Sequence, residues 1–153
     1  MIYVYNAGPL FSEADIKQRR YEGSKLKEAL KDTQHFIANP IDLPFDNSKV
    51  LTSKEIFDED YKHICNANVF FFELTTSDTG TMVEFGMAIE KKRQNNDIKI
   101  YPIFSDLRLA RNDAKGLECP VGFNSFVVGA CKSHDLTIYD SFEEALHAFK
   151  EII

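Results

Sequence analysis

Residues 69–84 read VFFFELTTSDTGTMVE, and this stretch decides the fold. Its first part, residues 69–74, is almost wholly apolar, which is typical of a parallel strand that is buried on both faces of a sheet. Residues 75–80 are polar and contain a glycine, so they favour a loop. Residues 81 to about 94 have the apolar spacing of a helix. A buried strand followed by a loop and a helix is the repeating unit of an α/β domain.

The same unit recurs along the 153 residues of the chain. Apolar runs predict further strands at residues 2–5, 35–38, 98–104 and 136–139. Helical spacing predicts helices at residues 12–31, 53–66 and 123–132 and a last helix after residue 141. Ser12, Ser53 and Ser141 are the predicted N-caps of the first, second and last of these helices. We therefore expect one domain over residues 1–153, with a three-layer, flavodoxin-like (Rossmann-like) α/β fold and a five-stranded parallel sheet in the order 2-1-3-4-5.

The composition excludes several classes of function. A net charge of -6 argues against nucleic acid or an anionic membrane as the main partner, and no apolar run approaches the length that spans a bilayer. The cysteines Cys65, Cys119 and Cys131 are odd in number and widely spaced, which disfavours a disulfide framework or a zinc site and favours a reducing cytoplasm. The histidines fall in separate predicted elements, so we expect no metal site.

In a sheet of this kind, ligands bind beyond the carboxyl ends of the strands. The loop after the third strand should place Asp78 at that edge and Glu84 one turn into the following helix, with Gly80 letting the backbone turn and a ligand approach. Apolar neighbours would partly desolvate the Glu84 carboxylate, and the nearby helix N-terminus would stabilise its negative form. An ionised, partly desolvated carboxylate is what a covalent nucleophile requires. The alternative is that Glu84 is an exposed first-turn residue and Asp78 only a cap.

The loop after the first strand, residues 6–11, reaches the same edge and lies within the sequence Tyr5-Asn6-Ala7-Gly8-Pro9-Leu10-Phe11. Ala7 and Gly8 would allow a small ligand close to the strand end, and the Tyr5 hydroxyl could donate a hydrogen bond to a carboxylate. The alternative is a turn that simply ends the strand. A single glycine is not a dinucleotide-binding fingerprint.

Taken together, Tyr-x-Ala-Gly-Pro at residues 5–9 and Asp-x-Gly-Thr-x-x-Glu-x-Gly at residues 78–86 resemble the nucleoside 2-deoxyribosyltransferases. The resemblance runs over most of the chain and includes a closing strand and helix. It implies that Glu84 attacks C1′ of a 2′-deoxynucleoside to form a deoxyribosyl ester, that Asp78 is the general acid, and that Tyr5 orients Glu84. It also implies nucleotide salvage, with 2′-deoxynucleosides and nucleobases as substrates and without a metal or organic cofactor.

Further positions take expected roles from the same resemblance. Asn68 stands just before the third strand, where the family usually has an aspartate that helps to bind the base or sugar. Asn124-Ser125-Phe126 matches an Asn-x-Met segment that reaches a neighbouring subunit's site and binds the sugar 5′-hydroxyl, which implies a homo-oligomer of two or more copies. The alternatives are that Asn68 only ends a helix and that Asn124 lies in a surface turn.

The loops at the ligand edge hold three more candidates. Phe11 and Phe45 could stack on a base or simply cover the core, and Asp42 is a candidate contact or a turn residue. Two other functions stay open. One is hydrolysis of 2′-deoxynucleosides or their 5′-monophosphates, for which Ser12, Arg19 and Arg20 are near in sequence. The other is non-catalytic binding, because a fold alone does not define a function.

Overall fold

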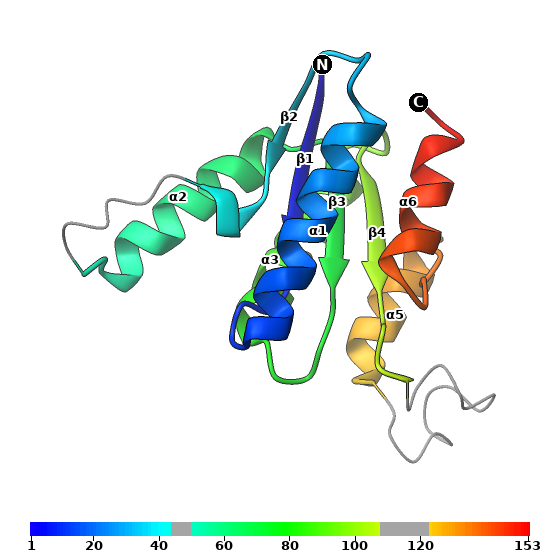
Figure 1. Ribbon diagram of the computed structural model, residues 1–153. Coiled ribbons are helices and arrows are strands. Elements are labelled where there is room, and N and C mark those ends of the chain that lie inside the picture. The colour runs from blue at the N-terminus through cyan, green and yellow to red at the C-terminus, as the bar shows by residue number, and fades with distance from the viewer. Residues whose placement is uncertain (44–49, 108–122) are drawn as a thin grey trace.

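The computed structural model describes residues 1–43, 50–107 and 123–153 and contains a parallel sheet between two layers of helices (Figure 1). The strands are β1 (Ile2–Ala7), β2 (His35–Ala38), β3 (Val69–Glu73) and β4 (Lys99–Ile103). The helices are α1 (Glu13–Ala29), α2 (Ser53–Asn66), α3 (Thr79–Gln94), α5 (Ser125–Ser133) and α6 (Phe142–Lys150), with a 3-10 turn, η1 (Pro40–Asp42). The sheet order is β2-β1-β3-β4, and every pair is parallel. The predicted α/β fold is therefore confirmed.

The prediction of a fifth strand at residues 136–139 is wrong. Only Tyr139 reaches the sheet, through a single bridge to Ile103. The backbone N–H of Leu136 is already used, because it donates to the carbonyl of Cys131 at the end of α5. Asp135 turns the chain there with a φ of 52°. The segment between α5 and α6 therefore ends one helix and leads to the next instead of forming a strand. The described sheet has four strands.

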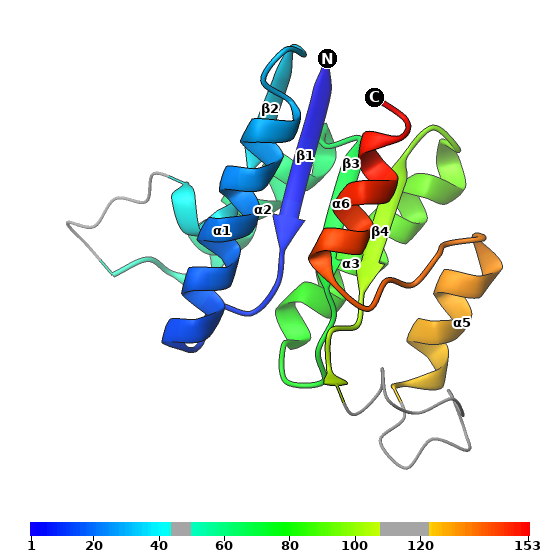
Figure 2. The ribbon, with the colours of Figure 1, turned by 45° about the vertical axis from the view of Figure 1, so that its right-hand side comes forward.

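The sheet has two buried faces, as the apolar run in β3 predicts. Phe70 and Phe72 point to one face, where α2, α3 and α5 pack. Phe71 points to the other face, where α1 and α6 pack. Figures 1 and 2 show the same division of the helices between the two faces. Alternate residues of a strand lie on opposite faces, so both sides of β3 are covered.

Polar caps fix where the helices begin. The predicted cap of α1 is confirmed, since the Ser12 side chain accepts from the Asp15 backbone and the Asp15 side chain accepts from the Ser12 backbone. For α2 the cap is Thr52 and not Ser53, and Thr52 forms the same reciprocal pair with Glu55. Ser141 caps α6 as predicted. None of the helices in the described ranges is long and apolar enough to cross a membrane.

Candidate active site

Glu84 lies in the second turn of α3 and meets a side chain from the centre of the sheet. Tyr5, from β1, is fully buried, and its hydroxyl donates a 2.7 Å hydrogen bond to Oε1 of Glu84. The predicted bond between this phenol and a carboxylate is therefore present. Burial and the nearby Glu84 carboxylate raise the pKa of Tyr5, which keeps the phenol a neutral donor. No residue in the described ranges bonds to Oε2 of Glu84, so this oxygen stays available for chemistry.

The surroundings of Glu84 make its ionised form costly. Burial raises the pKa of Glu84 to about 7, the hydrogen bond from Tyr5 opposes that rise, and the nearby carboxylates of Asp60 and Asp78 add to it. A buried carboxylate has lost the water that would stabilise its charge. A pKa near neutrality is typical of carboxylates that exchange protons or attack substrates in enzymes.

A cleft of about 400 Å³ opens between α2 and α3 at this carboxylate. From α3 it is lined by residues one turn apart: Gly80, Val83, Glu84 and Met87. From α2 it is lined by one helical stripe: Ser53, Ile56, Phe57, Asp60, Tyr61 and Ile64. A Cβ built at Gly80 would meet only an Asp78 oxygen, at 3.4 Å, so the missing side chain leaves this wall open. The cleft combines apolar walls with carboxylates, as small-molecule sites do.

Asp60 is a residue of this cleft that the sequence analysis did not single out. Its Oδ1 is buried and has no hydrogen-bond partner among the described residues. Burial raises the pKa of Asp60, the nearby Glu59 carboxylate also raises it, and His63 opposes the rise. One signal was available: Asp60 is a carboxylate on the apolar stripe of α2, the same feature that singled out Glu84 on α3.

Asp78 is the N-cap of α3, which begins at Thr79 and not at Thr81 as predicted. Its Oδ1 accepts from the Thr81 backbone N–H at 3.0 Å, and its Oδ2 accepts from the Thr81 hydroxyl at 2.7 Å. The side chain is 7% exposed. Both carboxylate oxygens are thus engaged in starting the helix that carries Glu84, while the charge of Asp78 still raises the pKa of Glu84.

The side chain of Arg19, from α1, packs against the loop that follows β1. A Cβ at Gly8 would overlap the Arg19 guanidinium and approach Cβ of Glu73 to 2.8 Å. Arg19 donates to the carbonyl of Ala7 at 3.3 Å and pairs with Glu22 at 2.8 Å. Glycine at position 8 is therefore required by this packing, and Ala7 is buried beside it.

The remaining candidates are not all brought to the cleft. Phe11 is 69% exposed at the start of α1, and Asp42 is bonded to Asn39 and lies 3.9 Å from Lys27. Phe45 lies outside the described residues.

Asn68 lies at the amino ends of the strands, away from Glu84. Its Oδ1 accepts from the Tyr3 backbone at 2.9 Å, and its Nδ2 donates to the carbonyl of Met1 at 3.1 Å. Asn68 therefore joins the start of β3 to the start of β1.

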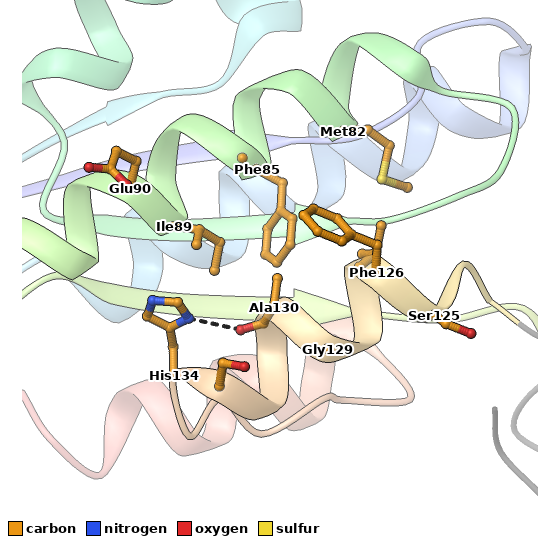
Figure 3. Close-up of a pocket in the computed structure, with 12 residues that line it drawn as sticks. Met82, Phe85, Ile89, Glu90, Ser125, Phe126, Gly129, Ala130 and His134 are labelled. Atoms are coloured by element: carbon orange, nitrogen blue, oxygen red, sulfur yellow. Dashed lines mark hydrogen bonds between the residues drawn. The ribbon is translucent and has the colours of Figure 1, made fainter.

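Asn124 and Phe126 lie beyond α3 from the cleft. Asn124 caps α5 through its Oδ1, which accepts from the Phe126 backbone at 2.9 Å. Phe126 is 87% exposed and lines a second groove of about 600 Å³ between α3 and α5. Figure 3 shows this groove with Met82 and Phe85 of α3 facing Phe126 and Ala130 of α5. Neither Asn124 nor Phe126 lines the cleft of its own chain.

Three similar proteins match along most of their length. An uncharacterized protein of Ureaplasma parvum serovar 3 is 28% identical over 140 residues, which are 87% of this chain and 85% of the relative. A conserved protein from Enterococcus faecalis V583 has a structure with a TM-score of 0.75 and 24% identity, over 100% of this chain and 99% of that one. A 2-desoxiribosyltransferase from Leishmania mexicana has a TM-score of 0.64 and 18% identity, over 99% of both chains.

A CMP N-glycosidase, BcmB, of Clostridium botulinum shares the fold as well, with a TM-score of 0.57 and 16% identity over 98% of both chains. At these identities the solved structures show the fold alone. The family is shown by a family model described as nucleoside 2-deoxyribosyltransferase, which matches residues 4–117 and so includes both Tyr5 and Glu84. Enzymes of that family act on N-glycosidic bonds. The match spans most of the chain, and this protein therefore belongs to the nucleoside 2-deoxyribosyltransferase family.

Proposed function

We propose that this protein cleaves the N-glycosidic bond of 2′-deoxynucleosides and transfers the deoxyribosyl group to another nucleobase. The observation that carries the proposal is Glu84, a carboxylate held by the Tyr5 hydroxyl at 2.7 Å and open to a cleft of about 400 Å³. Its position in the family's Asp-x-Gly-Thr-x-x-Glu-x-Gly motif supports the same role.

The reaction follows the logic of a retaining double displacement. In the first step, Oε2 of Glu84 attacks C1′, the bond from C1′ to the base breaks, and the base leaves with the bonding electrons and takes up a proton. In the second step, a ring nitrogen of the incoming base attacks C1′, the ester bond to Glu84 breaks, and that base gives up its proton. Atoms and charge balance with two carboxyl groups, and no cofactor is needed.

Asp60 is better placed than Asp78 to give and take this proton. Both oxygens of Asp78 already accept hydrogen bonds from Thr81. Asp60 faces the same cleft as Glu84, with one buried oxygen that has no partner among the described residues. Its pKa is raised by burial, so it holds a proton more readily than an exposed aspartate. The proton-donor role expected for Asp78 is accordingly assigned to Asp60.

A nucleoside is a better substrate for this chain than a nucleotide. Of the three side chains near the first loop that were candidates for a 5′-phosphate, Ser12 and Arg19 are committed elsewhere, and Arg20 is exposed on α1. Ser12 bonds to Asp15 as the cap of α1, and Arg19 is 3% exposed and paired with Glu22. Neither offers the free donors that a phosphate requires.

The active site is completed by a second copy of the chain. Phe126 is a large apolar side chain that is 87% exposed, and it lies across α3 from the cleft of its own chain. Contact between the Asn124–Phe126 segment and a substrate bound at Glu84 would therefore come from a neighbouring subunit. The proposal is a homo-oligomer of at least two copies.

The test is exchange between a donor nucleoside and an acceptor base. Incubation with 2′-deoxyinosine and adenine should yield 2′-deoxyadenosine, and Glu84→Gln should lose this activity. With a deoxynucleoside alone, mass spectrometry should find a deoxyribosyl adduct on the peptide that contains Glu84. Release of free base without any exchange would assign hydrolysis as the main activity. If several purine and pyrimidine deoxynucleosides give neither exchange nor base release, the proposal is wrong.

A further inference from the structure

Two aromatic rings of α2 lie at the cleft without a role in the chemistry described so far. Phe57 and Tyr61 are one helical turn apart, and their rings are stacked with centroids 5.4 Å apart and planes inclined by 11°. Phe57 is 49% exposed and Tyr61 is 45% exposed. Both line the cleft that contains Asp60 and Glu84. Large rings that are half-exposed, parallel and beside a reactive carboxylate are a binding feature rather than core packing.

The position of these rings relative to Asp60 decides what they can bind. Phe57 precedes Asp60 by three residues and Tyr61 follows it directly, so all three share the stripe of α2 that faces α3. A base that exchanges a proton with Asp60 must come within hydrogen-bond distance of its carboxylate. The flat face of such a base then has Phe57 and Tyr61 as its nearest aromatic neighbours on α2.

Given the proposed function, on which this inference rests, the geometry points to the Phe57–Tyr61 pair as the platform on which the nucleobase stacks. The walls around the pair are apolar and are formed by Ile56, Val83 and Met87. A base placed against the pair extends a stack that already exists, so little side-chain entropy is lost on binding.

A stacking platform has a consequence for specificity. Every nucleobase has a π-face, so stacking tolerates many bases and discriminates by ring size more than by hydrogen-bonding groups. That tolerance suits a reaction in which one base leaves and a different one enters the same place. The platform favours purines, whose two fused rings cover more of the aromatic pair than a single pyrimidine ring does.

The experiment measures binding of the free bases adenine and cytosine to Phe57→Leu by titration calorimetry or NMR, so that no turnover is required. Phe57→Leu keeps an apolar side chain and removes the ring. We expect adenine to bind about tenfold more weakly and cytosine to lose less. Phe57→Trp should bind adenine at least as well as the unaltered protein. Tyr21→Leu is the matched control, because Tyr21 is 41% exposed on α1, on the other face of the sheet, and its loss should leave both affinities unchanged.

The outcomes separate this inference from the proposed function. If the unaltered protein exchanges bases but Phe57→Leu binds adenine and cytosine as tightly as before, the platform is refuted and the proposed function stands. If the same variant changes only the sedimentation of the protein, the two rings belong to a contact between copies and the inference is again overturned. If Phe57→Leu does not fold by circular dichroism, Tyr61→Leu and Phe57→Trp decide the question by the same adenine measurement.

Discussion

At the scale of single residues, Glu84 carries two opposing requirements. A nucleophile has to be ionised, yet the burial that removes water from Glu84 raises its pKa to about 7. The Tyr5 hydroxyl opposes that rise by donating to Oε1. Hydrogen bonding to the charged form of an acid favours that form. Tyr5 is thus the group that keeps a useful fraction of Glu84 ionised near neutral pH.

This balance predicts a pH profile. The values of kcat/KM should fall on the acid side of about pH 7, by about tenfold for each further pH unit, because protonation removes the nucleophile. In Tyr5→Phe the hydrogen bond that lowers the pKa of Glu84 is gone, so the acid limb should move to higher pH and the rate at pH 7 should drop. The measurement is kcat/KM for 2′-deoxyinosine across pH 5 to 9, with the range chosen to bracket the free-enzyme pKa.

The control for Tyr5→Phe lies on the same strand and the same face of the sheet. The Tyr3 hydroxyl bonds to Nδ1 of His63 at 2.6 Å and not to Glu84. Tyr3→Phe should therefore leave the acid limb where it is. An acid limb that stays unchanged in Tyr5→Phe would show that this hydroxyl does not set the ionisation of Glu84.

The pair of Tyr5 and Glu84 could be predicted from the sequence, whereas Asp60 was missed. Neighbouring strands in an α/β sheet bring their following loops and helices to one edge, so the motifs at residues 5–9 and 78–86 had to meet. The place of Asp60 depends on which stripe of α2 packs against α3. The spacing of α2 does place Asp60 on an apolar stripe with Ile56 and Phe57, but it does not show that this stripe faces α3 and Glu84.

At the scale of elements, Asp78 has a structural role in addition to the acid role that the family resemblance implies, because it is the N-cap of α3. Asp78 belongs to the family motif, and in the structure its side chain caps α3, which begins at the next residue. An aspartate at an N-cap stabilises the helix by about 1 kcal/mol relative to alanine. Asp78 thus affects Glu84 in two ways. It fixes the first turns of α3, which carry Glu84, and its charge raises the pKa of Glu84.

A pair of substitutions separates the cap from the acid. Asp78→Asn keeps an N-cap acceptor. We therefore expect its melting temperature to stay close to that of the unaltered protein and its exchange rate to change by no more than a few fold. Asp60→Asn removes the proposed proton donor and should lower the rate by roughly 10²–10⁴-fold while the protein stays folded. With 7-methyl-2′-deoxyguanosine, whose cationic base leaves without protonation, Asp60→Asn should recover most of its rate of base release.

Steady-state rates and thermal unfolding curves of both variants are the measurements. A large loss of rate in Asp78→Asn with an unchanged melting temperature, together with a nearly normal rate in Asp60→Asn, would return the proton-donor role to Asp78. Asp78→Ala adds a second reading, because it should lose both stability and rate as the start of α3 frays and Glu84 is displaced.

Most elements could be predicted because their signals are local. The apolar run of β3 and the cap residues Ser12 and Ser141 are readable without a partner. The fifth strand could not be excluded in this way, since Leu136 and Ile138 are apolar for a different reason. They pack against the core on the face of α2, α3 and α5, while the backbone around them closes α5.

At the scale of the whole molecule, one chain carries its own proposed nucleophile, Glu84, but presents Phe126 to the outside. The cleft lies on one side of α3, and the groove of Phe126 lies on the other. In the homo-oligomer proposed above, the segment Asn124–Phe126 of each copy reaches the cleft of a partner, and in a closed symmetric pair this contact is made twice. Each complete site would then contain residues of two chains.

Subunit mixing tests this arrangement. Glu84→Gln and Asn124→Ala are each expected to be poorly active alone, since every site in either oligomer has one defect. When the two are co-expressed, mixed pairs contain one site with both defects and one with none, so activity should return to about a quarter of that of the unaltered protein for random pairing.

The matched control mixes Glu84→Gln with Asp60→Asn. Both residues line the cleft of their own chain, so every mixed site keeps one defect and no activity should return. No recovery in the test pair would show that the site is built from one chain, and a monomer in sedimentation would lead to the same conclusion. Recovery in the control would contradict the placement of Glu84 and Asp60 in one cleft.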